Sequence, residues 1–426
     1  MEKIESIYEK YLECSGVNTD TRSIQQDELF FALKGPNFNG NQYAEQALQS
    51  GAKYAVVDDP ELEENTNFIQ VSDSLGALQE LAKYHREQFD IPVLGLTGSN
   101  GKTTTKELTN SVLSKKYKVH CTAGNLNNHI GVPLTLLAMK HDAEIAVIEM
   151  GANHLGEIAS YCQIAQPTHG IITNIGTAHI GEFGGQENLI RAKSELFDYL
   201  RKTNGTVFIN KEDVVLSNMA RRFQKPVFFP DEKVTLKKST PFIEYLDDNG
   251  DLHQTQLVGK YNFQNAAAAL AIGRLFGVED SLAYQAIDSF SSNNNRSQLV
   301  TLGSNTVILD AYNANPDSCK VALESLAAFD TPKKLAFLGD MKELGEYSSS
   351  SHLEIFRASR KLGIPGFFVG KEYDEALRNE DAKTFLTLAE LTEWLKQNPI
   401  SNSTVLLKGS RSMTIEKLTE TKEIWN

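Results

Sequence analysis

The chain has 426 residues, with 42 Lys and Arg against 55 Asp and Glu, which gives a formal net charge of −13. At about 150 residues a domain, this length predicts about three domains, each able to bury a core without disulfides or structural metals. The acidic balance speaks against a general nucleic-acid binder, because such proteins neutralise phosphates with an excess of Lys and Arg.

The cysteines and the N-terminal residues indicate a cytoplasmic protein. Cys14, Cys121, Cys162 and Cys319 lie far apart, with neither a CxxC pair nor metal-ligand spacing, which favours free thiols. The charged start, Met1–Glu5, lacks the apolar segment of a signal peptide, and no apolar run approaches the ~18 residues that span a bilayer. We therefore expect a monomer without nucleic-acid or membrane partners.

Residues 1–90 mix helical and strand patterns and are predicted to form the first domain. A short helix over 44–51 precedes the apolar strand Tyr54–Val57. Residues 75–89 then carry apolar side chains at helical spacing, which predicts a second helix. A domain boundary near residue 90 fits this pattern.

Strand, loop and helix alternate from residue 91 to about 293, which predicts a central α/β domain with a mainly parallel sheet. Its clearest strands are 93–97, 145–148, 170–173 and 207–209. The run Ser291-Ser292-Asn293-Asn294-Asn295 is typical of a linker. The alternation then resumes, so residues 294–426 are predicted to form a third, Rossmann-like α/β domain. Its strands are 307–309, 335–338, 366–369 and 404–407.

A glycine-rich turn joins the strand 93–97 to a predicted helix and reads Thr97-Gly98-Ser99-Asn100-Gly101-Lys102-Thr103-Thr104. Such a turn binds phosphate through backbone N–H groups at a helix N-terminus. Lys102 would reach the β- and γ-phosphates, and the Thr103 hydroxyl would ligate Mg²⁺. Leu96 stands where the usual GxxxxGK[ST] pattern has its first glycine. The turn predicts a site for a nucleoside triphosphate.

Two polar segments follow strands of the same predicted sheet. Glu149 ends the strand 145–148, where a carboxylate beside a phosphate loop is placed to hold Mg²⁺. Asn210-Lys211-Glu212-Asp213 imitates the NKxD motif with which GTPases read guanine. A match of four common polar residues is a weak signal that a solvated turn also explains. A GTP-dependent switch is therefore the alternative from another class.

Further motifs stand in a fixed order along the whole chain: Thr19–Arg22, Leu29–Gly35, Gly124–Pro133, Glu149–His154, Thr173–Ile175 with Ala178-His179, Ala192–Glu195, Gly259–Asn265, Asp310–Pro316 and Lys408–Ser412. This ordered set resembles the Mur ligase family, the ATP-dependent amide-forming enzymes of peptidoglycan precursor synthesis. The resemblance implies an N-terminal domain for a UDP-sugar, a central domain for ATP and a C-terminal domain that completes the site. It is greatest to the members that join D-alanyl-D-alanine to UDP-N-acetylmuramoyl-tripeptide through an acyl phosphate.

The resemblance also implies roles for single residues. ATP binding falls to Gly98, Ser99, Asn100, Gly101, Lys102, Thr103, Thr104, Asn262, Asn265, Arg296 and Asp310. Two Mg²⁺ sites fall to Thr103, Glu149, His179 and Lys193, and the catalytic residues are Lys102, Glu149, His179 and Lys193. Mg²⁺ would repel a lysine, but in the family the matching lysine is carbamylated by CO₂. The same modification is implied for Lys193.

The remaining implied roles concern the two small-molecule substrates. Candidate contacts to the UDP-muramoyl-tripeptide are Thr21, Arg22, Asn41 and Asn128, and those to the dipeptide are Tyr312, Asn313, Lys408, Ser410 and Arg411. The chain departs from the family at two places. Asn295-Arg296 replaces a common Gly-Arg, and Asn39-Gly40-Asn41 stands where relatives often have Asp and His. Asn tolerates left-handed backbone angles, so the first turn can survive the change.

Two related ligases are the nearer alternatives: one that adds the third amino acid, and a folylpolyglutamate-type ligase. The first typically carries an Asp-Asn-Pro-Arg motif, which this chain lacks. The motifs at 312–316 and 408–411 favour the dipeptide-adding activity instead. We expect hinges near residues 90 and 293, because domain closure would exclude water from a hydrolysable acyl phosphate.

Overall fold

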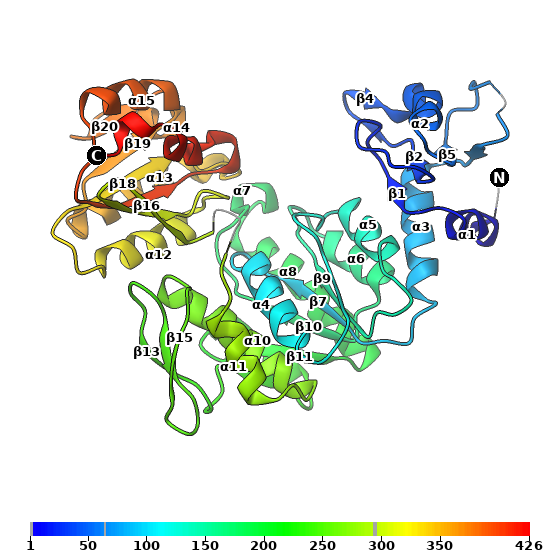
Figure 1. Cartoon of the computed structure of the whole chain (residues 1–426), viewed down its shortest axis with the longest axis horizontal. Helices are drawn as coiled ribbons and strands as arrows, with labels where there is room; N and C mark the ends of the chain where they lie inside the picture. The colour runs from blue at the N-terminus through cyan, green and yellow to red at the C-terminus, as the bar shows by residue number, and fades with distance from the viewer. Residues whose placement is uncertain (1–2, 64, 293–295) are drawn as a thin grey trace.

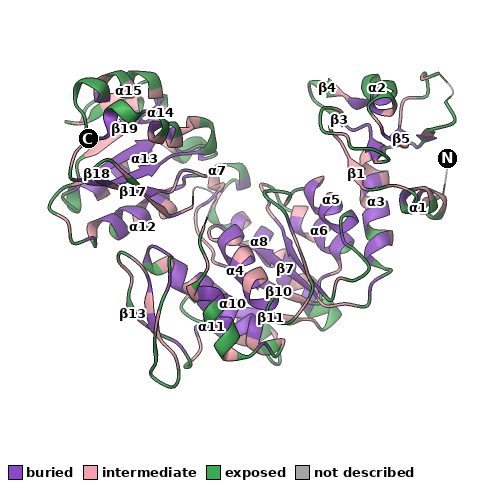
Figure 2. Ribbon diagram, in the orientation of Figure 1, coloured by how far each residue is buried: buried purple, intermediate pink, exposed green. Residues whose placement is uncertain are grey.

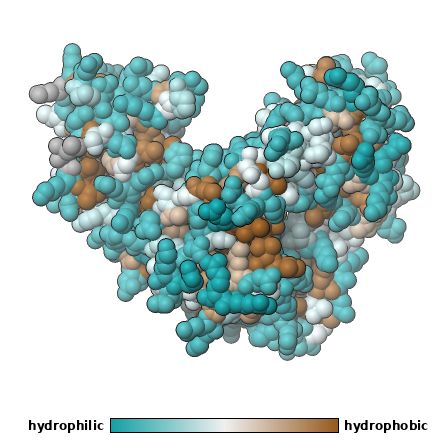
Figure 3. Space-filling model, turned by 180° about the vertical axis from the view of Figure 1, so that it is seen from behind, coloured by the Kyte–Doolittle hydropathy of each residue, from teal (hydrophilic) through white to brown (hydrophobic). Residues whose placement is uncertain are grey.

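The computed structural model describes residues 3–63, 65–292 and 296–426. Three regions follow one another in space as they do along the chain, with the central region between an N-terminal and a C-terminal arm (Figure 1). Seen from behind, the two arms stand apart above the centre (Figure 3). Every region contains strands and helices in alternation, so the predicted α/β class is confirmed.

The N-terminal arm is built on a four-stranded parallel sheet in the order β1-β2-β5-β6. Its elements are α1 (Ile4–Leu12), β1 (Val17–Asn18), β2 (Leu29–Phe31), β3 (Lys34–Gly35), β4 (Phe38–Asn39), η1 (Gly40–Tyr43), α2 (Ala44–Gln49), β5 (Tyr54–Val57), β6 (Phe68–Gln70) and α3 (Ser74–Arg86). Asp73 caps α3 by accepting a hydrogen bond from Leu75 N. The predicted helix–strand pair at 44–57 is confirmed, and α3 ends three residues earlier than predicted.

The central region contains a six-stranded parallel sheet in the order β12-β11-β10-β7-β9-β8. Its elements are β7 (Val93–Thr97), α4 (Lys102–Leu113), β8 (Val119–Cys121), α5 (Gly131–Leu137), β9 (Ile145–Glu149), α6 (Glu157–Ala165), β10 (His169–Ile172), α7 (Ile180–Phe183), α8 (Gln186–Thr203), β11 (Thr206–Asn210), α9 (Val214–Met219), η2 (Ala220–Arg222) and β12 (Val227–Phe229). Helices cover both faces, so the four inner strands β11, β10, β7 and β9 are almost entirely buried, whereas the edge strands β8 and β12 are partly exposed (Figure 2). The predicted mainly parallel sheet is confirmed.

A small antiparallel sheet in the order β13-β14-β15 follows the central sheet. The elements of this segment are β13 (Thr235–Lys238), β14 (Glu244–Leu246), β15 (Leu252–Gln254), α10 (Lys260–Leu275) and α11 (Asp280–Asp288). Helices α10 and α11 share an apolar core with α4 on one face of the central sheet, whereas α5, α6 and α8 pack on the other face. This sheet was not predicted from the sequence, because its strands are short and largely polar.

Helix α3 attaches the N-terminal arm to the central region. Its buried residues Leu78, Leu81 and Ala82 belong to the same apolar core as α5, α6 and α8. The buried guanidinium of Arg86 donates to the carbonyl oxygens of Ala165 at 3.1 Å and Phe89 at 2.6 Å. The predicted hinge near residue 90 therefore lies in a packed and hydrogen-bonded segment.

The C-terminal arm is a six-stranded sheet in the order β16-β17-β21-β18-β19-β20, in which β16 pairs antiparallel and the other strands pair parallel. Its elements are β16 (Gln298–Leu302), β17 (Asn305–Leu309), α12 (Pro316–Ala327), β18 (Lys334–Gly339), η3 (Gly345–Tyr347), α13 (Ser348–Lys361), β19 (Gly366–Val369), α14 (Lys371–Ala376), β20 (Lys383–Phe385), α15 (Leu388–Gln397), β21 (Thr404–Lys408), η4 (Arg411–Met413), η5 (Ile415–Glu420) and η6 (Lys422–Ile424). Helices α12 and α13 cover one face, and α15 covers the other. This is the predicted Rossmann-like arrangement.

The domain limits 1–90, 91–293 and 294–426 stay predictions, and residues 293–295 of the predicted linker lie outside the described residues. Asn295, which replaces the family's glycine, lies there as well. In the described part of the chain, no helix combines the length and the apolar character needed to cross a membrane.

Candidate active site

The predicted phosphate loop connects the carboxyl end of β7 to the N-terminus of α4. Gly98 has φ +142°, and a Cβ there would lie 2.0 Å from Thr173 Oγ1. Gly101 has φ +77°, and a Cβ there would lie 2.7 Å from Asn265 Oδ1, so glycine is required at both positions. The Lys102 ammonium donates to Gly98 O at 2.8 Å across the loop. The loop thus places a lysine and the first backbone N–H groups of α4 at a helix N-terminus, the arrangement that binds phosphate.

Residues after β10 brace this loop from the side. Thr173 Oγ1 and Asn174 Nδ2 both donate to Asn100 O, at 2.6 and 3.0 Å. Asn100 N donates to Asn174 Oδ1 at 3.0 Å, and Gly176 N donates to Ser99 Oγ at 2.9 Å. The loop is therefore fixed before any ligand binds.

Glu149 ends β9 and is 1% exposed. Its Oε1 accepts from Asn127 Nδ2 at 2.8 Å and from Thr103 Oγ1 at 3.3 Å. Its Oε2 has no hydrogen-bond partner among the described residues and lies 3.9 Å from Lys106 Nζ. A buried carboxylate oxygen without a donor is costly, so Glu149 and Thr103 fit a hard cation that prefers oxygen ligands.

Lys193 on α8 lies deep in the same region, 1% exposed. Its ammonium donates to Ala152 O at 3.2 Å and lies 5.1 Å from the centre of the Phe183 ring. Burial, followed by the charge of Lys102, lowers the pKa of Lys193 to about 7. Burial also lowers the pKa of Lys102. The uncharged amine of Lys193 is therefore far more accessible near neutral pH than that of an exposed lysine.

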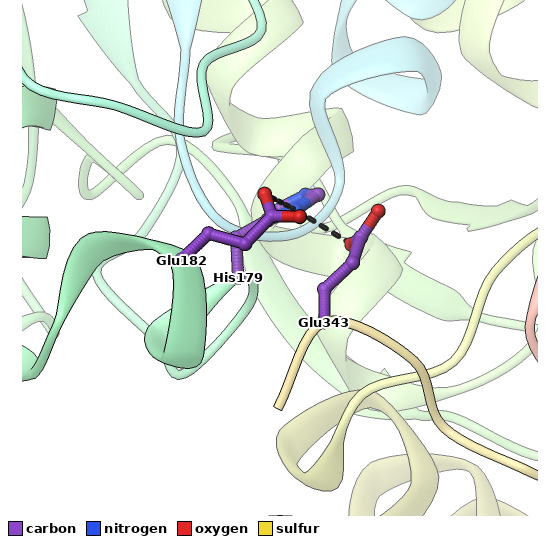
Figure 4. Close-up of side chains that lie close together, drawn as sticks. All are labelled: His179, Glu182 and Glu343. Carbon is purple, nitrogen blue, oxygen red and sulfur yellow. Dashed lines mark ion pairs between the residues drawn. The ribbon is translucent and has the colours of Figure 1, made fainter. Parts of the chain in front are cut away.

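His179 meets two glutamates where α7 faces the C-terminal arm (Figure 4). Its Nδ1 lies 2.6 Å from Glu343 Oε2 and 3.7 Å from Glu182 Oε2. The contact with His179 lowers the pKa of Glu343, whereas burial and the charge of Glu343 raise the pKa of Glu182. One ligand atom of each residue lies within 4.8 Å of the others, so the three can together hold a divalent cation.

The predicted adenine and ribose residues come from both sides of the domain junction. On α10, Asn265 Nδ2 donates to Asn262 Oδ1 at 2.8 Å, and Asn265 Oδ1 accepts from Thr105 Oγ1 at 3.1 Å. In the C-terminal arm, Asp310 Oδ2 accepts from the buried Lys408 ammonium at 2.7 Å. These bonds hold the side chains in place at the wall of the site.

The loop after β17 and the end of β21 bring further predicted residues to this wall. The Arg296 guanidinium lies 3.7 Å from the centre of the Tyr312 ring, and that of Arg411 lies 5.9 Å from the same ring. Both distances are within range of a cation–π contact. Ser410 Oγ donates to Asp340 O at 2.5 Å, which ties the end of β21 to the end of β18.

One cavity of about 1120 Å³ collects most of these residues. The sequence-predicted residues at its wall are Ser99, Asn100, Gly101, Lys102, Thr103, Thr104, Asn128, Glu149, His179, Asn262, Asn265, Arg296, Asp310, Tyr312, Asn313, Lys408, Ser410 and Arg411. Of the residues predicted for the ATP and metal sites, Gly98 and the buried Lys193 are not part of the described wall. The cavity therefore lies between the central region and the C-terminal arm.

The structure does not bring the predicted residues of the N-terminal arm to this cavity. The described wall contains neither Thr21, Arg22 nor Asn41. The exposed Arg22 pairs with Asp20 at 2.6 Å. Asn41 is buried, and its amide donates to Asp58 Oδ1 at 2.7 Å. Their proposed substrate contacts stay predictions.

Several residues at the cavity were not predicted from the sequence, namely Asn127, Asn174, Asp317 and Glu343. Glu182, which lies with His179 and Glu343, was not predicted either. Glu343 lies four residues after β18, and polar residues after parallel strands are a usable signal for a site. Nothing in the sequence pairs it with His179, because the two meet only across the domain junction.

The segment that imitates a guanine-reading motif has a structural explanation. Asp213 Oδ1 accepts from Val215 N and Leu216 N, at 2.9 and 3.0 Å, and so caps α9. Its Oδ2 accepts from Ile175 N at 3.1 Å. The aspartate is thus engaged by the protein backbone.

Comparison with known proteins places the whole chain in one family. Three family models match in order: "Mur ligase family, catalytic domain" at residues 13–86, "Mur ligase middle domain" at 96–273 and "Mur ligase, glutamate ligase domain" at 295–411. The UDP-N-acetylmuramoyl-tripeptide–D-alanyl-D-alanine ligase of Bacillus subtilis is 34% identical over 95% of this chain and 92% of its own length. The enzyme of the same name from Synechocystis is 36% identical over 83% and 79%.

Solved structures agree. Crystal structure I of MurF from Acinetobacter baumannii has a TM-score of 0.88 at 29% identity, covering 99% of this chain and 98% of its own. The MurF ligase of Thermotoga maritima in complex with ADP has a TM-score of 0.84 at 27% identity, covering 97% and 98%. The three-domain plan implied by the sequence motifs is confirmed, and the chain belongs to the Mur ligase family.

Proposed function

We propose that this protein is an ADP-forming ligase that joins D-alanyl-D-alanine to UDP-N-acetylmuramoyl-tripeptide in peptidoglycan precursor synthesis. The observation that carries the proposal is the cavity in which the phosphate loop, Glu149 and His179 face Arg296 and Asp310 of the C-terminal arm. Relatives that match along nearly the whole chain carry this activity in their names, and one structural neighbour holds ADP.

The chemistry explains why such a site is needed. A carboxylate is a poor acylating agent, so the terminal carboxylate of the tripeptide first attacks the γ-phosphorus of ATP, and ADP leaves. The free amine of the dipeptide then attacks the acyl carbon, the bond to phosphate breaks, and the nitrogen loses a proton. Negative charge collects on the phosphoryl oxygens in the first step, so catalysis needs positioned donors and cations.

ATP use follows from the family, and the assignment of its contacts is our proposal. The loop N–H groups between Gly98 and Thr104 bind the phosphates, and Lys102 reaches the γ-phosphate after leaving Gly98 O. Asn262 and Asn265 lie near the adenine. Asp310 binds the ribose and Arg296 a phosphate, both from the C-terminal arm. Their position across the cavity supports closure of that arm over the nucleotide.

Two magnesium sites complete this arrangement. Thr103 and Glu149 hold the first, a role supported by the buried Glu149 Oε2, which accepts no hydrogen bond from the described residues. His179 and carbamylated Lys193 hold the second. Bound Mg²⁺ supplies charge neutralisation at the phosphates. The protein's own part is to keep these ligands in place, which Asn127 does by donating to Glu149 Oε1.

Carbamylation of Lys193 is supported by its burial, which lowers the pKa of the ammonium. Only a neutral amine attacks CO₂; the Nζ–C bond forms, the nitrogen loses a proton, and an anionic carbamate replaces the ammonium. A pKa of about 7 makes the neutral form abundant at physiological pH. An exposed lysine has roughly one neutral side chain in several thousand at that pH.

The substrates occupy the remaining surfaces. Thr21, Arg22 and Asn41 of the N-terminal arm bind the UDP-muramoyl part, and Asn128 contacts substrate from the cavity wall. The dipeptide binds near Tyr312, Asn313, Lys408, Ser410 and Arg411. Arg411 is exposed, so its guanidinium can turn from Glu416 toward the terminal carboxylate of the dipeptide.

We also infer that one chain suffices and that it works in the cytoplasm, where ATP is available. Light scattering coupled to size-exclusion chromatography tests this: a mass near 47.3 kDa is expected. A stable dimer would contradict the inference.

The decisive experiment is phosphate release from ATP with defined acceptor pairs. Release that requires both UDP-muramoyl-tripeptide and D-alanyl-D-alanine is expected, together with a product of the summed mass. Equal activity with a single amino acid in place of the dipeptide would refute the proposal in favour of a sister ligase. Folate and glutamate as substrates would indicate the folylpolyglutamate type.

A nucleotide comparison addresses the GTP-dependent alternative. ATP should support amide formation, and a preference for GTP without an amide product would refute the ligase assignment. Lys102→Ala should reduce turnover by at least about 100-fold because it removes a cation from the phosphates. Lys115→Ala removes an exposed lysine just beyond the C-terminal end of α4, the helix that begins at Lys102. This variant is the matched control and should retain activity.

A further inference from the structure

The N-terminal end of α12 reaches across the domain junction to the segment that follows β10. Asp317 Oδ2 accepts from Thr177 N at 2.6 Å and from Thr177 Oγ1 at 2.8 Å. Next to it, Asn315 Nδ2 donates to Asn100 Oδ1 of the phosphate loop at 2.7 Å. The C-terminal arm thus contacts both the loop and the segment leading to His179.

These contacts are close because the central region offers glycine at the points of approach. A Cβ on Gly176 would lie 2.6 Å from Asp317 Oδ2, and a Cβ on Gly181 would lie 2.4 Å from the carbonyl carbon of Leu344. A side chain on Gly181 would clash with the backbone, and a side chain on Gly176 would push the Asp317 carboxylate away. The two glycines flank His179, so this segment is shaped to receive the C-terminal arm on both sides.

Capping of α12 does not account for the Asp317 contact. The cap is Asn315, whose Oδ1 accepts from Ser318 N, while the Ser318 hydroxyl receives a bond from Asn315 N. Asp317 is the second residue of the helix, and its Oδ2 accepts both hydrogen bonds from Thr177, 140 residues earlier in the chain. A charge-assisted bond to a backbone N–H fixes the main chain itself.

Thr177, which donates two hydrogen bonds to Asp317, lies two positions before His179. The backbone of His179 is left-handed, with φ +60°. Such a conformation in a non-glycine residue persists only where neighbours hold it. Thr177 O also accepts from Ile180 N at 3.2 Å, which starts the turn that presents His179. Fixing Thr177 therefore fixes where His179 points.

We propose that Asp317 is a positioning residue. By accepting two hydrogen bonds from Thr177 across the domain junction, it holds His179 in place for phosphoryl transfer when the C-terminal arm is docked. This inference rests on the proposed ligase function for its kinetic consequence. The hydrogen bonds between Thr177 and Asp317 themselves are present in the ligand-free protein. Asp317 thereby couples the position of the C-terminal arm to the assembly of the catalytic centre.

Hydrogen–deuterium exchange and kinetics on the full chain test the proposal together. In Asp317→Ala, the Thr177 amide should exchange at least about tenfold faster, because it loses an acceptor worth that factor. The value of kcat should fall about ten- to hundredfold, while KM for ATP changes less than about threefold, because adenine and ribose contact other residues. Asp317→Asn keeps one acceptor oxygen and should recover part of kcat.

Two further variants separate positioning from a general loss of structure. Gly176→Ala leaves Asp317 intact but places a methyl group against it, and should reproduce the kcat loss. Asp330→Asn removes the same charge from an exposed residue beyond the other end of α12 and should behave as wild type. Combining Asp317→Ala with Thr177→Ala should cost less than the product of the single effects, because the two residues share one interaction.

Clear results overturn the inference. Wild-type exchange at Thr177 in Asp317→Ala, kcat within twofold of wild type, or multiplicative effects in the double variant would each refute it. If the wild-type protein itself releases no phosphate with the proposed substrates, the proposed function fails. The exchange rates of the Thr177 amide still decide whether Asp317 holds Thr177 by hydrogen bonds.

Discussion

Replacing Lys193 by methionine should stabilise the folded protein and at the same time abolish its activity. A fall in the pKa of Lys193 from 10.5 to about 7 means that the fold disfavours the ammonium by about 5 kcal/mol. Methionine has a similar length and no charge. The lost hydrogen bond to Ala152 O costs about 1 kcal/mol, so the expected net gain is about 4 kcal/mol at pH 6.

The size of this gain depends on pH, with a sign set by proton linkage. The pKa of Lys193 is lower in the folded than in the unfolded state, so the cost of the ammonium is complete below about pH 7. It disappears as the pH rises from about 7 to about 10. The advantage of Lys193→Met should therefore be large at pH 6 and nearly absent at pH 10. Carbamylation also removes the ammonium, so bicarbonate should narrow the gap at intermediate pH.

Scanning calorimetry is the appropriate assay, because both tryptophans, Trp394 and Trp425, lie in the C-terminal arm and their fluorescence would not follow the domain that holds Lys193. For a domain of this size, about 4 kcal/mol raises the melting temperature by about 8–16 °C. Lys202→Met, an exposed lysine on the same helix, is the control and should change little at any pH. An equal gain at pH 6 and pH 10, or no gain at pH 6, would refute the reasoning.

Three further substitutions test other parts of the site and the fold. Glu149→Gln should lower kcat by about 100-fold or more and raise the Mg²⁺ concentration needed for phosphate release, because it removes the negative charge of the Mg²⁺ ligand that acts with Thr103. An unchanged Mg²⁺ dependence would contradict this assignment. Gly98→Ala should weaken ADP binding in titration calorimetry at least about tenfold, because its Cβ would lie 2.0 Å from Thr173 Oγ1; wild-type affinity would be the contrary result. Arg86→Met should cost about 3 kcal/mol of stability and expose the chain near residue 90 to proteolysis, which an intact cleavage pattern would exclude.

The parts of the site that depend on local sequence were predictable. The phosphate loop needs a strand, glycines and a helix N-terminus in direct succession, and all of these stand within the segment from Val93 to Leu113. Glu149 follows from the same logic, since the carboxyl ends of parallel strands meet at one edge of a sheet. Residue chemistry and spacing alone identify both.

Residues whose function depends on burial or on domain docking were not predictable in this way. On its helix, Lys193 reads as an ordinary lysine, and only the family resemblance singled it out before its burial was seen. Glu343 and Asp317 reach the site from another domain, and no periodicity links them to His179 or Thr177. Their positions follow from how two separately folded regions meet.

The two junctions that the sequence marked as hinges differ physically. At the first, α3 shares an apolar core with the central region, and opening it would expose that core and strip Arg86 of its carbonyl partners. At the second, few apolar residues outside the C-terminal arm, such as Ile180 and Val258, pack against its core. Other contacts there include polar bonds, such as those of Asp317 with Thr177, which water can replace when the arm moves away. We therefore expect the C-terminal arm, rather than the N-terminal arm, to move, and the contacts that break and form again to be the polar ones at its face, that of Asp317 with Thr177 among them.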